Sequence, residues 1–381
     1  MKKTINYFYK KKFFFIFLLT LAIVQILNIK NLNIHGYPLS FNDLKWSGSN
    51  LFLQNKNIYE IFYSGNYENQ IIGAQFPNYL VSSLYFHLPF GYFNFKTASF
   101  IWTCFTFLLL IHSYLIYEKK NLMLKNQDKV IFFSFILLIF SEPFNWLISN
   151  GNYSIVCFWA INYFFLSQHK SKFIPLFVTF IKYSFAPILI FYSLLNKDIK
   201  IILLVVLLNI ILMIHFSYIF NYNFFQLIFD PLIIGSKSTA SGFFDLQTLL
   251  GNHPSNVLLR YSLIIFISFI VYFYIYNLTL RNSLFDLSIM VLATLLFYKH
   301  LYYDQILLLP VLIYSFKLHY KLRIMTISII LYYWFIAYLE VLHPIRYWKT
   351  FMLFNNSLSV ICIYIIFKAN ELSKKTIFNN N

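Results

Sequence analysis

Charged residues are scarce in this chain of 381 residues. Asp, Glu, Lys and Arg together make up 11% of it, whereas hydrophobic residues make up 59%. Soluble domains carry about 25% charged residues, so this composition excludes an ordinary soluble domain. Because about twenty consecutive apolar residues cross a bilayer as a helix, the long apolar runs predict an all-α, multi-span integral membrane protein.

Cysteine is also rare, and so are the motifs of several enzyme classes. The three cysteines, Cys104, Cys157 and Cys362, lie within apolar runs without C-x-x-C spacing, which argues against a disulfide framework and a zinc site. The sequence has no P-loop, no G-x-G-x-x-G motif and no His-rich metal spacing. We therefore expect neither a metal nor a cofactor.

Acidic residues are few, 13 against 30 basic ones, and the net charge is +17. The basic residues form short clusters between apolar runs, which is typical of membrane orientation by the positive-inside rule and does not indicate a nucleic-acid partner. The clusters are Lys10–Lys12, Lys119 with Lys120, Lys170 with Lys172, and Lys374 with Lys375.

About twelve apolar runs follow one another without a visible repeat, so we expect a single transmembrane domain over residues 1–381. The first run lacks a small-residue cleavage site and predicts a retained helix. The expected spans are residues 12–29, 95–117, 130–148, 153–167, 171–181, 184–196, 199–219, 257–279, 284–299, 305–317, 324–341 and 351–367.

The basic loops predict that both termini are cytoplasmic. Two long segments, residues 30–94 and 220–256, then lie outside, and eight of the thirteen acidic residues are expected on that side. Residues 76–91 are predicted to be re-entrant or peripheral, and the run 173–195 is predicted to be a hairpin divided at Lys182. The many Asn, Lys, Ile and Phe residues are typical of an AT-rich bacterial genome, so we expect the bacterial plasma membrane.

The first outer segment contains a polar stretch, "FNDLKWSGSNLFLQNKNIYEIF". Its apolar residues Leu44, Leu51 and Ile58 recur with polar or small residues between them, which predicts a short amphipathic helix on the membrane surface and a second one after it. Asp43 opens this stretch. It can act as a general base at the water interface, or it can simply cap the surface helix.

Five segments resemble, in their order, those of glycosyltransferase family 87, whose members have the GT-C fold. The first is the stretch from Asp43 through "NIY" to "FPNYLVSSLYFHLPFG", in which "FPN" stands where the family has Tyr-Pro-Pro. It is followed by "SEPFNWLISNGNYSIVCFWAINYFFLS", "VTFIKYSFAPILIFYSLLNK", "FDLQTLLGN" and "YKHLYYDQILLLPVLIY". The resemblance covers roughly residues 12–317.

This resemblance implies a membrane glycosyltransferase. Such an enzyme transfers a sugar, mannose or a similar hexose, from a polyprenyl-phosphate donor to a glycan or glycolipid acceptor at the extracytoplasmic face. The reaction inverts the anomeric carbon and uses neither a metal nor a nucleotide sugar. Asp43 then becomes the catalytic base. Lys182, an ionisable residue in an apolar run, is expected to bind the donor phosphate, unless it only extends to the interface.

Two further groups are candidates for binding the substrates. The cluster Lys299, His300, Tyr303 and Asp304 lies between two expected spans and can hold the phosphate or the acceptor, although Tyr and Lys are also common at membrane interfaces. Asn150 and Asn152 flank Gly151. They can contact a sugar, or they can form nothing more than a turn.

Two other functions fit a chain with about a dozen spans. An O-antigen-type polymerase usually relies on arginines in outer loops, and here only Arg260 and Arg346 are expected outside. A lipid-linked-sugar flippase or transporter needs ionisable groups along a path through the membrane, whereas most charges here lie at expected span ends.

Overall fold

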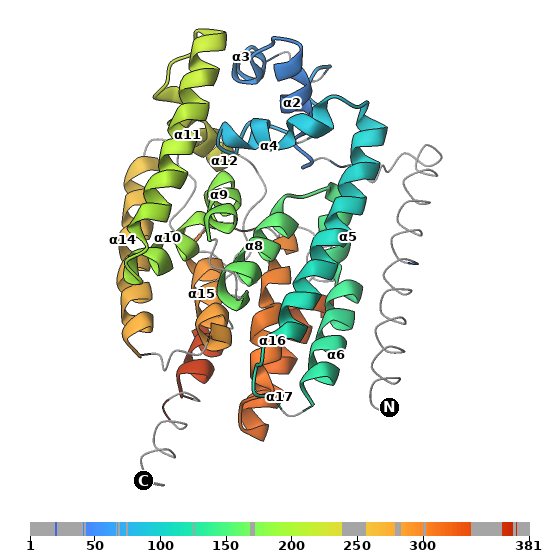
Figure 1. Ribbon diagram of the computed structural model, residues 1–381, viewed down its shortest axis with the longest axis vertical. Coiled ribbons are helices and arrows are strands. Elements are labelled where there is room, and N and C mark those ends of the chain that lie inside the picture. The colour runs from blue at the N-terminus through green and yellow to red at the C-terminus, as the bar shows by residue number, and fades with distance from the viewer. Residues whose placement is uncertain are drawn as a thin grey trace, which may run out of the picture.

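The computed structural model describes the chain over residues 20, 41, 43–65, 67, 69–73, 75–124, 126–167, 172–237, 257–278, 283–298, 300, 302–336, 360–368 and 371. Within these ranges the chain is helical and contains no strand, which confirms the all-α class (Figure 1). Most of the expected first span, residues 12–29, and part of the last, residues 351–367, lie outside the described residues.

The central helices run alternately between the two ends of a bundle. We call the end that holds Asp43 the site end. Helix α5 leads away from it, α6 returns, α7 lies at the site end, and α8 leads away again (Figure 1). Their bounds are α5 Phe95–Lys119, α6 Gln127–Phe140, α7 Glu142–Asn150 and α8 Ser154–Leu166.

The span expected over residues 130–148 is divided in the structure, because α6 ends and α7 begins at Ser141 with a bend of 59° between them. Two residues explain the break. Ser141 is extended and its hydroxyl accepts a hydrogen bond from the Phe144 N–H at 3.4 Å, as an N-cap does. Pro143 lies in the first turn of α7, where its missing N–H is tolerated.

Helices α9 (Phe173–Ile181) and α10 (Ala186–Leu195) form the hairpin expected around Lys182. Lys182 ends α9 with an extended backbone, and its side chain lies at the site end. At the other end of the hairpin, Lys172 Nζ and Asp198 Oδ2 are 3.1 Å apart. This ion pair therefore holds the start of α9 close to the end of α10.

The remaining helices complete the bundle. Helix α11 returns to the site end, α12 lies there, α14 leads away, α15 returns, and η2 continues into α16 (Figure 1). The bounds are α11 Ile199–Phe220, α12 Gln226–Lys237, α14 Val257–Leu278, α15 Ser283–Phe297, η2 Tyr302–Leu308, α16 Leu309–Ser315, α17 Tyr320–Leu331 and the π-helical turn η3 Tyr332–Ile336.

Two of the described helices, α5 and α11, are each long and apolar enough to cross a membrane, and the bent pair α6 and α7 makes a third if it counts as one span. The expected number of about twelve crossings is not confirmed, because no further helix among the described residues meets this criterion of length and hydropathy. The surface of α11 is nonetheless strongly apolar. Leu203, Leu207 and Ile214 are 61%, 53% and 55% exposed, as is usual for a face in contact with lipid.

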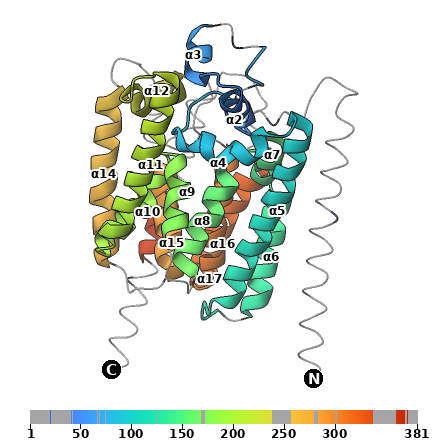
Figure 2. The ribbon, with the colours of Figure 1, turned by 45° about the horizontal axis from the view of Figure 1, so that its top comes forward.

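Three short helices lie across the site end of the bundle and form what we call the surface layer: α2 (Trp46–Leu53), α3 (Ile58–Tyr63) and α4 (Ser82–Gly91) (Figure 2). Leu44, Leu51 and Ile58 are all buried, as their spacing predicted. Helices α2 and α4 pack closely, and the Ser49 hydroxyl donates to the Leu84 carbonyl at 2.8 Å. The peripheral placement expected for residues 76–91 agrees with the position of α4.

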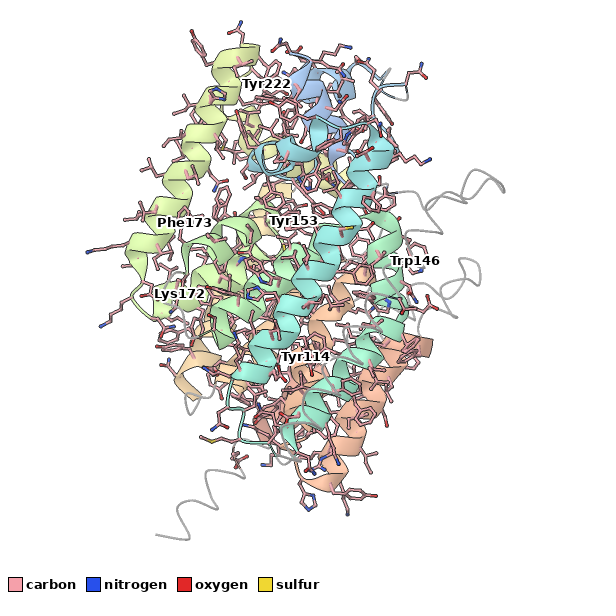
Figure 3. All side chains as sticks on the ribbon, turned by 45° about the vertical axis from the view of Figure 1, so that its right-hand side comes forward. Tyr114, Trp146, Tyr153, Lys172, Phe173 and Tyr222 are labelled. Carbon is pink, nitrogen blue, oxygen red and sulfur yellow. The ribbon has the colours of Figure 1, made fainter. Side chains whose placement is uncertain are left out.

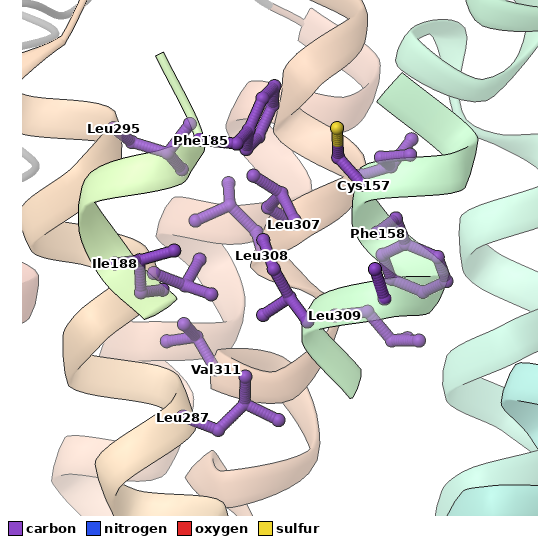
Figure 4. Close-up of a cluster of buried hydrophobic side chains, with 14 of the residues drawn as sticks. Cys157, Phe158, Phe185, Ile188, Leu287, Leu295, Leu307, Leu308, Leu309 and Val311 are labelled. Carbon is purple, nitrogen blue, oxygen red and sulfur yellow. The ribbon is translucent and has the colours of Figure 1, made fainter. Parts of the chain in front are cut away.

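The bundle is closed beneath the site by a core of aliphatic and aromatic side chains from α8, α10, α15, η2 and α16 (Figure 4). Phe158, Ile188 and Leu287 are fully buried there. Tyr153, labelled in Figure 3, joins this core to α9, because its hydroxyl donates to the Val178 carbonyl at 3.0 Å. The start of α8, which carries site residues, is therefore fixed on a packed support.

Candidate functional site

The position of Asp43 is set by two backbone hydrogen bonds to the end of α7. The Phe41 N–H donates to the Ser149 carbonyl at 3.1 Å, and the Asp43 N–H donates to the Asn150 carbonyl at 3.0 Å. Both bonds use carbonyls that the C-terminal turn of a helix leaves unpaired. The first outer segment is thereby attached directly to the turn that precedes α8.

The turn between α7 and α8 depends on glycine. Gly151 has a φ of 62° and follows the last residue of α7, a conformation that favours glycine because it has no Cβ. A Cβ at this position would lie 2.6 Å from Cδ1 of Phe41 and 3.2 Å from Cβ of Leu44. The chain that carries Asp43 can pass this close only because residue 151 is glycine.

Two neutral donors hold one oxygen of the Asp43 carboxylate. Asn152 Nδ2 donates to Oδ2 at 3.2 Å, and the Tyr303 hydroxyl donates to the same atom at 3.1 Å. Among the described residues, no hydrogen bond is made to the other oxygen, Oδ1. The carboxylate is thus oriented through Oδ2, while Oδ1 remains available to a substrate.

The structure contradicts the alternative that Asp43 caps the surface helix. The N-cap position of α2 is held by Lys45, which has a φ of 40° and makes no side-chain capping bond. The hydrogen bonds of the Asp43 side chain go instead to Asn152 and Tyr303, on α7–α8 and η2. Asp43 therefore belongs to the interior of the site.

A second polar group lies beside the first and is centred on a buried ion pair. Lys182 Nζ is 2.9 Å from Asp304 Oδ1, and the two side chains are 8% and 0% exposed. Lys182 also donates to the Ser154 hydroxyl at 2.7 Å, and Ser154 hydrogen-bonds to Asp304. A buried ammonium is costly unless it is paired in this way.

His300 completes this group on the far side of Asp304. Its Nδ1 lies 3.1 Å from Asp304 Oδ2, and its Nε2 lies 3.2 Å from the Thr294 carbonyl. The imidazole also contacts the ring of Phe185, with the ring centroids 4.8 Å apart. His300 is completely buried, and its contact with Oδ2 holds the Asp304 carboxylate in place.

Asn152 and Ser154 connect the two groups. The Asn152 Oδ1 atom accepts from the Ser154 N–H at 2.8 Å and lies 2.5 Å from the Ser154 hydroxyl, while its Nδ2 reaches Asp43. A continuous series of side chains therefore runs from His300 through Asp304, Ser154 and Asn152 to Asp43. Such a network fixes the geometry of each member.

Lys45 is the second cation of the site, and the sequence reasoning did not single it out. Its Nζ donates to the Phe76 carbonyl at 3.3 Å and lies 4.7 Å from the centroid of the Tyr79 ring. Burial lowers the pKa of the Lys45 ammonium to about 8, a shift that Asp43 opposes and that the Lys182 charge increases. The Tyr79 ring also lies 6.0 Å from Lys182 Nζ.

Most of the residues expected to form a site are brought together. Asp43, Asn152, Lys182, Tyr303, Asp304 and His300 form one connected group, and Asn150 contributes its backbone carbonyl. Lys299 lies outside the described residues. Three participants were missed: Lys45, Ser154 and Tyr79. Lys45 is only two residues from Asp43, a proximity that could have indicated it, whereas nothing in the sequence distinguishes Ser154 or Tyr79 from other hydroxyl residues.

The arrangement has the elements of acid–base and anion chemistry. One oriented carboxylate can accept a proton. The ammonium group of Lys45 can stabilise negative charge that develops nearby. Lys182 can do the same to the extent that its pairing with Asp304 leaves positive charge for a second anion. Comparison with known proteins adds no assignment, because no family model, no curated protein and no solved structure matches this chain.

Proposed function

We propose that this protein is a membrane glycosyltransferase of the GT-C type, which transfers a sugar from a polyprenyl-phosphate donor to an acceptor at the extracytoplasmic face. The donor sugar is proposed to be mannose or a similar hexose, and the acceptor a glycan or glycolipid. The resemblance of five ordered segments to glycosyltransferase family 87 suggests this function. The observation that carries it is the position of Asp43.

Asp43 has the position expected of a general base. Asn152 and Tyr303 hold Oδ2, so that Oδ1 can receive the proton of the acceptor hydroxyl. As that proton moves to Oδ1, the acceptor oxygen forms a bond to the anomeric carbon. The bond between this carbon and the phosphate oxygen breaks, and the electron pair leaves with the polyprenyl phosphate. A single displacement of this kind inverts the anomeric configuration.

The leaving phosphate needs cations, and we propose that Lys45 is the principal one. Its ammonium donates to the Phe76 carbonyl at 3.3 Å, lies 4.7 Å from the centroid of the Tyr79 ring, and is close enough to Asp43 for the two charges to interact. Lys182, expected from the sequence to have this role, is already paired with Asp304 and Ser154. We therefore assign Lys182 to the network that positions Asn152, and Lys45 to the donor.

The test is sugar transfer from labelled polyprenyl-phosphate-mannose in membranes that contain the wild-type chain, Asp43→Asn or neither. Because Asp43 does not cap α2, the asparagine variant is expected to reach the same protein level while transfer falls by about 10²–10⁴-fold. Glu60→Gln is the matched control, since it removes an exposed carboxylate of α3 at the same end of the molecule. Its transfer should equal that of the wild type.

Two outcomes contradict the proposal. Equal transfer by the wild type and Asp43→Asn would remove Asp43 as the base. Absence of transfer from a panel of polyprenyl-phosphate hexoses would contradict the enzyme itself, and a proteoliposome flipping assay would then test the flippase alternative.

A further inference from the structure

A groove of about 400 Å³ opens between α5 and α8 at the end of the bundle opposite Asp43. Helix α5 has 25 residues, so its last residues lie about 37 Å along the helix axis from its first. This length exceeds the roughly 30 Å of a bilayer's hydrocarbon core. The groove therefore lies at the membrane interface farther from the candidate site and does not belong to it.

The wall formed by α5 combines apolar and cationic residues on one helical face. His112, Leu115, Ile116 and Lys119 line the groove, and their spacing of i, i+3, i+4 and i+7 places them on the same side of the helix. Lys120, which follows the last turn of α5, also lines it. The lysines thus lie at the C-terminal end of α5, and Leu115 and Ile116 lie about one turn closer to the middle of the bundle.

The wall formed by α8 has a similar order. Tyr163, Leu166 and Ser167 line the groove, with Ser167 at the C-terminal end of the helix. Trp159, one turn before Tyr163, donates from Nε1 to His112 Nδ1 at 2.8 Å and so connects the two walls. A neutral His112 that accepts at Nδ1 carries its proton on Nε2, which is then a hydrogen-bond donor.

We propose that this groove binds an anionic phospholipid, with the phosphate of the head group at Lys119, Lys120 and Ser167 and an acyl chain along Leu115, Ile116 and Leu166. The two ends of the groove match the two parts of such a molecule. Glu118, the carboxylate closest in sequence, is not among the residues that line it. The basic clusters place this end of the bundle at the cytoplasmic leaflet, where anionic lipids are concentrated.

A phospholipid fits the groove better than a soluble phosphate does. A free phosphate would use only the lysine end and would leave the apolar walls in contact with water. The lysines also complement the C-terminal end of α5, where cations are favourable, so the experiment must separate lipid binding from this local stabilisation.

The test uses the full-length chain reconstituted in bilayers with brominated phospholipids, which quench tryptophan fluorescence on contact. Trp159→Phe identifies the part of the signal that comes from the groove. Brominated phosphatidylglycerol is expected to quench the Trp159 signal with higher affinity than brominated phosphatidylcholine. Replacing both lysines, in Lys119→Ala/Lys120→Ala, is expected to abolish this preference, with a loss of about fivefold for each lysine. Inorganic phosphate should not compete.

Two further variants make the test selective. Lys129→Ala removes an exposed lysine of α6 at the same end of the bundle but outside the groove, and it should keep the preference. Leu115→Phe keeps both lysines but fills the groove, and it should lose the quenching. Equal quenching by both lipids in the wild type, a preference that survives the double lysine substitution, an equal loss in Lys129→Ala, or full competition by inorganic phosphate would each overturn the proposal.

Discussion

Asn152 and Asp43 are 109 residues apart in the sequence and are joined by a hydrogen bond of 3.2 Å from Nδ2 to Oδ2. Tyr303, 260 residues from Asp43, donates to the same oxygen. The carboxylate is consequently positioned by the turn between α7 and α8 and by η2, although it lies on the first outer segment. The candidate base and its supports come from three distant parts of the chain.

The first prediction concerns Tyr303→Phe. This substitution removes one of the two donors to Asp43 and leaves the ring, so the carboxylate becomes less well oriented while the fold is retained. Since one hydrogen bond contributes about 1.4 kcal/mol, we expect kcat for sugar transfer to fall about tenfold with little change in KM. Tyr222→Phe is the control, because the Tyr222 hydroxyl donates at 2.6 Å to Asp230 of α12, which does not belong to the network around Asp43. An equal loss in both variants would show that Tyr303 has no specific role.

The second prediction compares the ion pairs made by two lysines at opposite ends of helix α9, Lys182 and Lys172. Lys182→Met leaves Asp304 buried without the lysine cation. We therefore expect the free energy of unfolding to fall by about 3–5 kcal/mol. Lys172→Met breaks the pair with Asp198, whose side chains are 30% and 34% exposed, and should cost less than about 1 kcal/mol. Denaturant unfolding in detergent measures both. Adding Asp304→Asn to Lys182→Met should recover part of the loss, and a fully additive double variant would contradict the coupling.

The third prediction is a pH dependence that originates at Lys45. Because burial lowers the pKa of its ammonium from 10.5 to about 8, the cation proposed to hold the donor phosphate is lost as the pH rises through 8. We expect KM for the donor to rise between pH 7 and pH 9. Lys45→Arg, whose guanidinium stays protonated, should have a KM that is flat over this range.

The same shift predicts how stability changes with pH. The folded chain binds the Lys45 proton less tightly than the unfolded chain does. The contribution of this group to stability is therefore lowest below pH 8, rises between pH 8 and pH 10.5, and is constant above that. Unfolding midpoints of the wild type and of Lys45→Met, measured at pH 7 and pH 9, check the sign. A wild type that loses stability relative to the variant at pH 9 would contradict it.

The fourth prediction concerns Gly151→Ala. The new Cβ would lie 2.6 Å from the Phe41 ring, so the segment that carries Asp43 must move away from α7. We expect sugar transfer to be largely lost, together with more than about 1 kcal/mol of stability. Gly65→Ala is the matched control. Gly65 has a φ of 78° but nothing within 4 Å of the added Cβ, so it should show the backbone cost alone and keep its activity.

The sequence predicted those parts of the fold and site that depend on local pattern. The helical class follows from the apolar runs. The hairpin of α9 and α10 follows from the position of Lys182 in the middle of the apolar run 173–195. The burial of Leu44, Leu51 and Ile58 follows from their spacing. The division at Ser141 was not predicted, although the Ser-Glu-Pro sequence there contains an N-cap and a proline that could have indicated it.

The rest of the site depends on contacts between distant residues. Lys182 and Asp304 are 122 residues apart, and no periodicity in either segment indicates that they meet. Lys182 was therefore assigned to the donor phosphate, whereas the structure shows that it is paired within the protein. Lys45 was missed for a related reason, because its burial against the Phe76 carbonyl and the Tyr79 ring is a property of the folded chain.

The attachment of Asp43 to the end of α7 has a consequence for how this protein can evolve. Both connecting hydrogen bonds, from Phe41 to Ser149 and from Asp43 to Asn150, join backbone atoms alone. Substitutions at positions 149 and 150 can therefore alter the side chains there without removing the hydrogen bonds that hold the main chain carrying the carboxylate. Descendants of this chain could therefore change the side chains at these two positions while inheriting the Asp43 carboxylate in the same place.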